Sequence, residues 1–438
     1  MKLLHITAHM GGGIGRTISG LVVNETENRH RVLCLQRPER DHFVRQCMEG
    51  GTQVICQPGP DQLAQAVGEA DVCILHWWGH PAMAELLAHF PPIPTRCILW
   101  NHVNGLYYPW LSPLLLEPAS RVFLTSPCSS DVEEWTTEQR QKLLLEKTDV
   151  VFGLGDLSKF IPVRKKRDPA APIRVGYVGS FVKSKIHPQF VRICAWILGA
   201  CPHIQFVLAG DPREYQWIAD SARAMGIFDA FIFTGYVEDV PELLNSLDIF
   251  MYPLNKTHFA TTENSILEAM AMELPVVLLN QSTERTIVTH QENGILAENT
   301  KDFAEWVCML AEDPDLRFHL GWEARKSVIS RRNIGDNIKN FLNGIYCAAD
   351  QAKKRLIWPN YANCEPWQWF LNSVRPDMAL AFMKAKDGHW EPFQKLMNEM
   401  PVFREPSKGS VPHFSRTFPN DPVLSQWNAV INRMNNEG

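Results

Sequence analysis

The sequence has no run of about 18 to 20 apolar residues, the length that a membrane-spanning helix requires. Its opening, MKLLHITAHMGGG, has only a short apolar stretch before polar residues and glycines, which is too little for a secretory signal. Its 11 cysteines include no CxxC pair. These absences predict a cytoplasmic protein with reduced thiols. Any contact with a membrane would be peripheral, on the inner face of the inner membrane.

A surplus of basic residues is also missing. The chain has 43 lysines and arginines against 48 aspartates and glutamates, a net charge of -5. Proteins that bind nucleic acid broadly usually carry a strong excess of positive charge. The charge balance therefore argues against a nucleic-acid partner and favours a small or neutral ligand.

What the sequence does contain is a long alternation of strand-like and helix-like segments. At 438 residues, the chain is too long for one ordinary core. Apolar runs such as KLLHITA, DVCILHWW and RCILWNHV are separated by segments long enough for crossover helices, as parallel strands require. The pattern restarts with IRVGYVGS after the proline-rich, basic segment IPVRKKRDPAAPI. We therefore predict an α/β protein with two doubly wound sheets.

The predicted domains follow from this restart. We expect an N-terminal Rossmann-like domain over residues 1–162, a linker over 163–172 and a second Rossmann-like domain over 173–349. Residues 350–438 show no strand alternation and many aromatic residues, so we expect a helical extension there.

The first chemical motif is a glycine run, GGGIG at residues 11–15, between a strand and a helix. Glycines at a helix N-terminus offer backbone N–H groups to an anion and allow a ligand to approach the main chain. The run does not fit a dinucleotide fingerprint, because no acidic residue closes a second strand. Gly12 and Gly13 are therefore candidates for ligand contact, and a tight turn without a ligand is the alternative.

A second motif is the segment FATTENSILEAMAMELPVVLLN, residues 259–280. Ser265 and Glu268 have the spacing of a capping box, and Thr262 is another candidate N-cap that could contact a ligand. A helix start of this kind can hold a diphosphate through its dipole. Glu268 could then bind ribose and Glu263 could reach a sugar. Alternatively, Glu268 only closes the capping box and Glu263 is a solvated charge.

A basic loop follows the first strand of the predicted second sheet. It carries Lys183 and Lys185, whose ammonium groups could neutralise a leaving diphosphate, although surface lysines are usually only solvated. Ligands of open α/β sheets bind outside the carboxyl ends of the strands. A cation, a helix N-terminus and a carboxylate at one such edge favour a nucleotide sugar.

The second half resembles the retaining GT-B glycosyltransferases of the family 4 type, also called glycosyl transferases group 1. It has, in the family's order and spacing, the segments YVGSFVKSK, VLAGDP, FTGYVEDVPELLNSLDIFMYPL, TTENSILEAMAMELPVVLL and ENGILA. The first half is similar more loosely, through HMGGGIGRTISGL, LWNHVNG, VFLTSPCSSD and VVFGLGDLSKF. The resemblance covers roughly residues 1–347 and implies two Rossmann-like domains that face a cleft.

The resemblance also implies roles for single residues. Gly12 and Gly13 would line the phosphate and acceptor side, and His102 would lie near the reacting sugar. Lys185 would hold the diphosphate, with Lys183 as a possible substitute. The other implied donor contacts are the base at Tyr236 and Val237, the phosphates at Asn264 and Ser265, and the ribose at Glu268.

Four positions depart from the family pattern. The first glutamate of the family's E-x7-E motif falls on Ala260, so that Glu263 would have to take over the contact with the donor hexose. The family's arginine after the first strand is Ser180. A glycine before the later strand is Glu273, and a glutamate near the last motif is Thr286. These departures leave the choice of donor open.

The implied activity is transfer of a hexosyl unit, with retention, from a nucleotide diphosphate sugar to a glycan or lipid-linked acceptor, as in bacterial surface polysaccharide biosynthesis. Front-face attack in this family uses no metal and no cofactor beyond the donor. The candidate catalytic residues are His102, Lys185 and Glu263. The alternatives are an inactive sugar-nucleotide-binding partner subunit and an epimerase or phosphorylase with the same fold.

Some polar motifs have weaker interpretations. His76 and His80 in HWWGH have i, i+4 spacing but follow a strand, so a loop that lines the cleft is favoured over a helical metal pair. The stretches RKKR (164–167) and KKR (353–355) could touch anionic lipid, but solvated charge is favoured.

The aromatic residues of the extension have an open role. Trp367, Trp369 and Trp390 could stack on sugar rings, lie at a bilayer interface or pack into a core.

Overall fold

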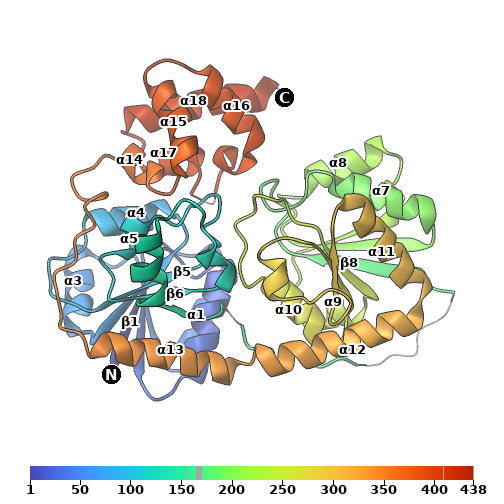
Figure 1. Cartoon of the computed structure of the whole chain (residues 1–438), viewed down its shortest axis with the longest axis horizontal. Coiled ribbons are helices and arrows are strands. Elements are labelled where there is room, and N and C mark those ends of the chain that lie inside the picture. The colour runs from blue at the N-terminus through green and yellow to red at the C-terminus, as the bar shows by residue number, and fades with distance from the viewer. Residues whose placement is uncertain (154, 164–169, 408, 438) are drawn as a thin grey trace. The chain divides into compact units, whose positions relative to one another are not determined.

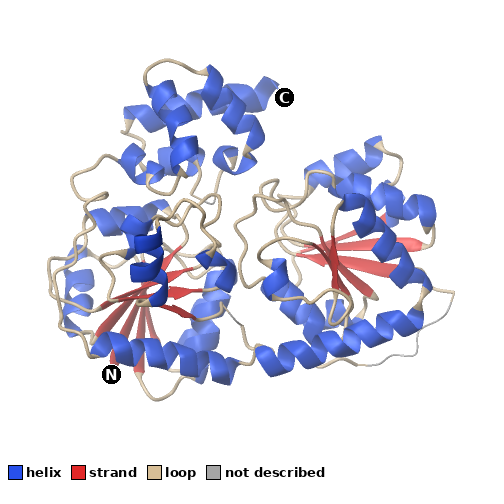
Figure 2. Ribbon diagram, in the orientation of Figure 1, coloured by secondary structure: helices blue, strands red, loops and turns tan. Residues whose placement is uncertain are grey.

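The computed structural model describes residues 1–153, 155–163, 170–407 and 409–437 (Figures 1 and 2). The chain divides into two compact units, Met1–Gly155 with Ile334–Gly438, and Asp156–Asn333. The basic stretch RKKR and part of the predicted linker lie outside the described residues.

The first unit is built on a sheet of seven parallel strands in the order β3-β2-β1-β4-β5-β6-β7. The order runs outward from β1 in both directions, as expected for a doubly wound sheet. Its strands are β1 (Lys2–Thr7), β2 (Arg29–Cys34), β3 (Gln53–Cys56), β4 (Val72–Trp77), β5 (Cys97–Asn101), β6 (Arg121–Leu124) and β7 (Thr148–Val150). Its helices up to the second unit are α1 (Gly12–Asn24), α2 (His42–Glu49), α3 (Pro60–Glu69), α4 (Pro81–Ala88), α5 (Pro113–Leu116) and α6 (Thr137–Gln139).

Helix α13 (Ile334–Ala349) covers one face of this first sheet. Its Phe341 and Ile345 are fully buried in one cluster with Ile74 and Trp100 of the sheet. The prediction that residues 334–349 complete the second domain differs from this packing. The sequence shows that the helix has an apolar face, but it does not show which sheet that face covers.

The C-terminal extension is helical, as predicted, and it packs against α4 of the first unit. Its helices are α14 (Pro366–Leu371), α15 (Pro376–Lys386), α16 (Glu391–Glu399), α17 (Val411–Thr417) and α18 (Pro422–Glu437). Trp358 and Trp427 belong to the same buried cluster as Leu99 of β5. Trp358 Nε1 donates to the carbonyl of Leu115 at 3.0 Å. The extension therefore shares its core with the first unit.

The residues for which lipid or sugar contact was considered are part of this packing. Lys353 donates to the carbonyl of Ala70 at 2.8 Å. Trp369 is buried, and Trp367 and Trp390 are partly buried against the same cluster. The packing interpretation of the three tryptophans thus agrees with the structure.

The second unit is built on six parallel strands in the order β10-β9-β8-β11-β12-β13. The strands are β8 (Ile173–Val178), β9 (Ile204–Ala209), β10 (Phe231–Gly235), β11 (Ile249–Tyr252), β12 (Val276–Leu279) and β13 (Ile295–Ala297). The helices are α7 (Phe190–Ala200), α8 (Gln216–Ala224), α9 (Val240–Asn245), α10 (Asn264–Ala271), α11 (Thr300–Glu312) and α12 (Pro314–Arg331). The prediction of two doubly wound sheets is confirmed. Among the described helices, none combines the length and the apolar character needed to cross a bilayer.

Candidate functional site

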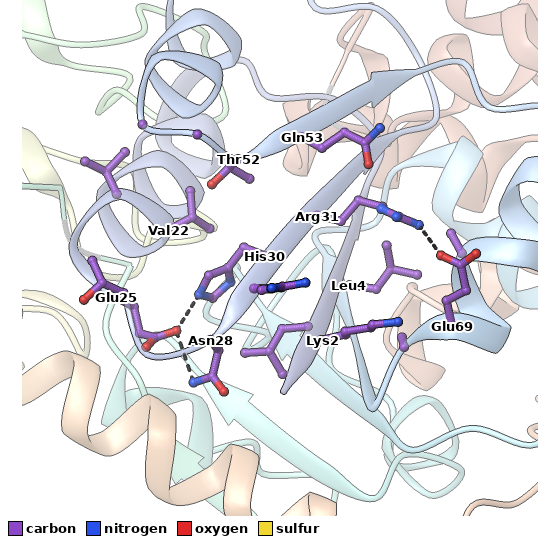
Figure 3. A pocket seen from close by; sticks show the side chains of 18 residues that line it. Lys2, Leu4, Val22, Glu25, Asn28, His30, Arg31, Thr52, Gln53 and Glu69 are labelled. Carbon is purple, nitrogen blue, oxygen red and sulfur yellow. Dashed lines mark hydrogen bonds and ion pairs between the residues drawn. The ribbon is translucent and has the colours of Figure 1, made fainter.

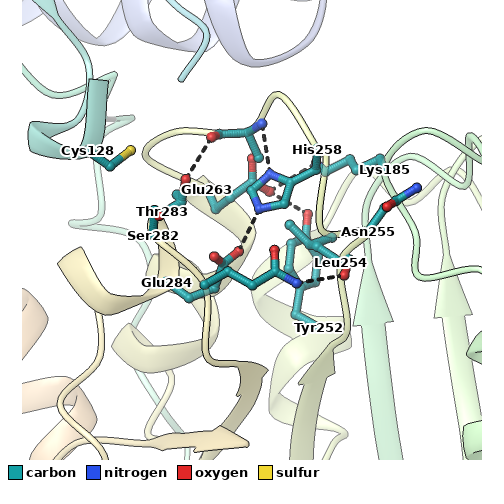
Figure 4. Close-up of polar contacts among 12 residues, drawn as sticks. Cys128, Lys185, Tyr252, Leu254, Asn255, His258, Glu263, Ser282, Thr283 and Glu284 are labelled. Atoms are coloured by element: carbon teal, nitrogen blue, oxygen red, sulfur yellow. Dashed lines mark hydrogen bonds and ion pairs between the residues drawn. The ribbon is translucent and has the colours of Figure 1, made fainter. Parts of the chain in front are cut away.

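The carboxyl edge of the second sheet brings Lys185 and Glu263 together. Lys185 lies in the loop after β8, and Glu263 lies between β11 and α10; these two strands are neighbours in the sheet. Lys185 Nζ is 2.9 Å from Glu263 Oε2, and the two side chains are only 13% and 11% exposed (Figure 4). Two of the three predicted catalytic residues therefore form one largely buried ion pair.

Tyr252, the last residue of β11, contacts both members of this ion pair. Its hydroxyl donates to Glu263 Oε2 at 2.6 Å, and its ring lies 5.4 Å from Lys185 Nζ. Burial alone would raise the pKa of Glu263, but the Lys185 ammonium and the Tyr252 hydroxyl lower it below its ordinary value. Burial alone would lower the pKa of Lys185, but the Glu263 carboxylate raises it. Both groups are therefore charged near neutral pH.

The start of α10 differs from the predicted capping box. The N-cap is Glu263, with φ of 44° and no side-chain cap, so neither Thr262 nor Ser265 caps the helix. Ser265 lies inside the first turn instead, because the chain enters the helix from the left-handed Glu263. Asn264 and Ser265 still form the first turn, whose N–H groups point out of the helix end. Glu268 lies one turn further and is only 3% exposed, so its predicted ribose contact stays a prediction.

The position of the missing family glutamate is occupied by a buried polar network. The N–H of Ala260 donates to His258 Nδ1 at 3.0 Å, and its carbonyl accepts from Thr283 Oγ1 at 3.0 Å. His258 Nε2 is 3.3 Å from Glu284 Oε1 (Figure 4). His258 and Glu284 were not predicted from the sequence, because their contact joins two segments far apart in the chain and follows no local motif.

The other predicted donor contacts lie in loops at the same edge of the sheet. Lys183 is exposed, and Tyr236, directly after β10, is 54% exposed, with Val237 half-buried beside it. Ser180, at the position of the family's arginine, donates from its hydroxyl to Glu214 Oε2 at 2.7 Å. The family has an arginine at this position, which could pair with a phosphate. In this chain the position is held by a serine that is hydrogen-bonded to the carboxylate of Glu214.

In the first unit, the predicted glycines and His102 lie at the carboxyl edge of the first sheet. Gly12 and Gly13 form the exposed first turn of α1, and a Cβ at either position would have no heavy atom within 4 Å. His102 directly follows β5, and its Nε2 lies 2.8 Å from His76 Nδ1. Burial lowers the pKa of His102 to about 3, so the imidazole is neutral.

The positions of the two histidines of HWWGH differ from the prediction that they lie in a loop that lines the cleft. His76 is a fully buried residue of β4, and His80 is the N-cap of α4, where its Nδ1 accepts from the N–H of Ala82. Strand β4 runs to Trp77, so His76 belongs to the strand itself, within the apolar run DVCILHWW.

A cavity of about 620 Å³ lies at the other end of the first sheet (Figure 3). It is lined near the amino ends of β1 and β2 by polar side chains, among them Glu25, His30 and Arg31. Its lining includes none of the predicted site residues.

Residues 172–313 match the family described as glycosyl transferases group 1, and this range includes Lys185, Glu263 and α10. The predicted resemblance to the glycosyl transferases group 1 is confirmed over this range.

Two curated relatives each match about a third of this chain. The chain is 25% identical over 164 residues to the capsular polysaccharide biosynthesis glycosyltransferase CapM of Staphylococcus aureus, covering 35% of this chain and 40% of the relative. It is 29% identical over 154 residues to the N-acetyl-alpha-D-glucosaminyl L-malate synthase of Bacillus anthracis, covering 35% and 39%. The chain thus spans about two fifths of the length of these relatives.

Solved structures show the fold over a longer range. The crystal structure of Anabaena HepE in complex with UDP and glucose has a TM-score of 0.63 at 18% identity, covering 79% of this chain and 99% of that one. The sucrose-phosphate synthase of Thermosynechococcus elongatus has a TM-score of 0.59 at 17% identity, covering 80% and 100%. The two Rossmann-like sheets are those of the GT-B fold, as predicted.

Proposed function

We propose that the protein is a retaining glycosyltransferase that moves a hexosyl unit from a nucleotide diphosphate sugar to a glycan or lipid-linked acceptor. The observation that carries this proposal is the buried pair of Lys185 and Glu263 beside the N-terminus of α10. A cation and a helix N-terminus at one sheet edge provide two sources of positive potential for a diphosphate.

In the proposed reaction, the bond between the sugar anomeric carbon and the diphosphate oxygen breaks, and the diphosphate takes the electron pair. Lys185 and the first turn of α10, at Asn264 and Ser265, stabilise the charge that grows on the leaving group. The acceptor oxygen attacks from the same face, which retains the anomeric configuration, and its proton passes to an oxygen of the leaving diphosphate. Glu263 then contacts the donor hexose in place of the family's glutamate, with Thr262 and Glu268 nearby in the same segment.

The relatives support the substrate classes. HepE was crystallised with UDP and glucose, and CapM is named for capsular polysaccharide biosynthesis. For this chain, a nucleotide-sugar donor and a role in surface polysaccharide assembly are proposed by analogy. Tyr236 and Val237 would contact the base, and Gly12, Gly13 and His102 would lie on the acceptor side.

An inactive nucleotide-sugar-binding subunit is a second candidate. It is favoured by Ala260 and by the pairing of Ser180 with Glu214, which remove two groups of the family pattern. Both candidates bind a nucleotide, but only the enzyme turns a donor over.

Isothermal titration with UDP, GDP and ADP, followed by NMR assays of donor hydrolysis and transfer, tests the proposal. Lys185→Ala should weaken binding of the preferred diphosphate about 100-fold, as expected for one lost charge partner of about 3 kcal/mol. Lys301→Ala, which changes an 81% exposed lysine on α11 of the second unit, is the control. Binding without turnover for every donor would favour the inactive subunit, and equal affinity in both variants would refute the site.

A further inference from the structure

The ion pair of the second unit occupies the cation that a diphosphate needs. Lys185 is the proposed contact for the diphosphate, yet its Nζ already lies 2.9 Å from Glu263 Oε2 (Figure 4). Both side chains are largely buried. A diphosphate that reaches Lys185 must therefore either replace the carboxylate or share the ammonium group with it.

Sharing one ammonium group between two anions is unfavourable at this place. Like charges at contact distance repel, and the repulsion is stronger in a largely buried site than in water. Among the described residues, Glu263 forms no ion pair except the one with Lys185, and its other close partner is the neutral Tyr252 hydroxyl at 2.6 Å. A Glu263 that loses Lys185 is therefore a largely buried carboxylate beside a diphosphate.

The groups that face the pair from β8, β9 and β11 do not offset this charge. Tyr252 stacks on Tyr177 of β8 with ring centroids 4.8 Å apart, and burial raises the pKa of both phenols, so both stay neutral. Glu214, between β9 and α8, adds a second carboxylate whose charge acts on Lys185. It accepts from the Ser180 hydroxyl at 2.7 Å and from the N–H of Phe181 at 2.9 Å. These surroundings add negative charge and no further cation.

His258, in the same segment as Glu263, is the other titratable group to weigh. It lies close enough to Glu263 to act on its charge. Its Nδ1 accepts from the N–H of Ala260 at 3.0 Å, and its Nε2 faces Glu284 Oε1 at 3.3 Å. A proton added at Nδ1 would break the bond to Ala260, because two donors would then face each other. The carboxylate of Glu263 is therefore better placed than His258 to take up a proton.

We propose that Glu263 is a built-in counter-ion of Lys185, which the diphosphate of the donor replaces while Glu263 takes up one proton. The proposal rests on the proposed function, in which Lys185 holds the diphosphate. In the exchange, the contact between Lys185 Nζ and Glu263 Oε2 breaks, a diphosphate oxygen takes its place, and a proton from the solvent bonds to the carboxylate. The neutral carboxyl group then has an O–H to donate to the diphosphate or to a hexose hydroxyl.

The exchange fixes the direction in which donor affinity depends on pH. Against the effect of burial, Lys185 and the Tyr252 hydroxyl hold the pKa of Glu263 below its ordinary value of 4.5 in the free protein. In the complex, burial and the neighbouring diphosphate should raise it. Between these two pKa values, binding takes up one proton, so the affinity should fall about tenfold for each rise of one pH unit.

Isothermal titration of the full chain with UDP-glucose and GDP-mannose between pH 5 and 8 tests the proposal. Both diphosphates are esterified at each end, so they do not change charge in this range. Titrations in two buffers that differ in ionisation enthalpy count the protons taken up. We expect about one proton for each bound ligand, with the affinity highest at the acidic end. Binding with no proton uptake and an affinity independent of pH would overturn the exchange.

Glu263→Gln removes the competing anion and the titrating group together. The glutamine still accepts from Tyr252 but neither pairs with Lys185 as an anion nor takes up a proton. We expect no proton uptake, an affinity independent of pH and binding about tenfold tighter at pH 7. Equal affinity in the variant and the natural protein at pH 7 would show that the carboxylate does not compete. If the variant is unstable, the titrations of the natural protein still decide the question.

Two control variants locate the proton. Glu214→Gln removes a neighbouring negative charge but keeps an acceptor for Ser180 and Phe181. His258→Asn removes the imidazole but keeps an oxygen that can accept from the N–H of Ala260. Proton uptake should stay at about one in both variants. Its loss in either of them would overturn the assignment to Glu263.

The outcomes separate the exchange from the proposed function. A ligand that binds the natural protein without proton uptake leaves donor binding standing and overturns only the exchange. A ligand that binds only Glu263→Gln supports the counter-ion, which then blocks the site in the natural protein. If neither protein binds any nucleotide sugar, the proposed site at Lys185 fails, and the exchange fails with it.

Discussion

The two sheets have the same winding but hold their polar groups in different ways. At the carboxyl edge of the second sheet, a charged pair of Lys185 and Glu263 is held by Tyr252. The first sheet instead carries neutral histidines, which end at His102. One edge therefore presents a charged pair, and the other presents a neutral imidazole.

The surroundings of the two sheets also differ. The first sheet shares a core with the extension, through Trp358 and Trp427, and with α13 on its other face. The second sheet is covered by helices from its own segment of the chain, such as α7 and α11. We therefore expect the stability of the first unit to depend on residues 334–438, far from its sheet in sequence.

The largest expected effect comes from Trp427→Ala. The side chain is fully buried, with ring centroids 5.1 Å from Phe382 and 6.1 Å from Phe370. Its loss should cost about 3 to 5 kcal/mol of unfolding free energy. Hydrogen exchange read by mass spectrometry should show faster exchange throughout the first unit, including β5, and unchanged exchange in the second unit.

Trp322→Ala is the control for this change. Trp322 lies on α12 of the second unit and is 48% exposed, so its removal should cost less than about 0.5 kcal/mol. If Trp427→Ala loosened only the extension and left β5 protected, the extension would be an independent domain.

The second prediction concerns the ion pair of the second unit. Lys185→Met leaves Glu263 as a buried, uncompensated carboxylate and should cost about 3 kcal/mol of stability. The double variant Lys185→Met with Glu263→Gln should recover most of this loss, because the glutamine still accepts from Tyr252. Denaturant titrations of the single and double variants measure the coupling. No recovery in the double variant would show that Lys185 stabilises the unit in another way.

The sequence predicted the two sheets and the residues near one edge of the second sheet, because these follow local patterns. Strand-like runs, crossover lengths and the segment around Glu263 are each contiguous in the chain. The contact between His76 and His102 could not be predicted, since the two residues become neighbours only when β4 and β5 pair in the sheet. The N-cap at Glu263 was missed because the left-handed backbone is set by the preceding loop and not by the capping pattern.

The third prediction is a pH dependence that only the charged edge should show. The lowered pKa of Glu263 stabilises the folded protein above the ordinary value of 4.5, and this contribution is lost as the pH falls through the folded pKa. The difference in unfolding free energy between the natural protein and Glu263→Gln should therefore be constant near pH 7 and shrink below about pH 4.5. Denaturant titrations between pH 3 and 7 measure it. A difference that grows on acidification would contradict the charge state assigned to Glu263.

The smallest expected effect tests a family position that the second unit has lost. Glu273, where the family has glycine, adopts φ of 59°, a left-handed conformation that strains residues with a Cβ. Glu273→Gly should stabilise the protein by about 0.5 kcal/mol, since the relief of strain exceeds the entropy that glycine loses on folding. Glu273→Ala keeps the Cβ and should give no gain in stability. The difference between the thermal melts of the two variants therefore measures the cost of the left-handed backbone at this position. An equal gain in both variants would place the cost in the glutamate side chain and not in the backbone.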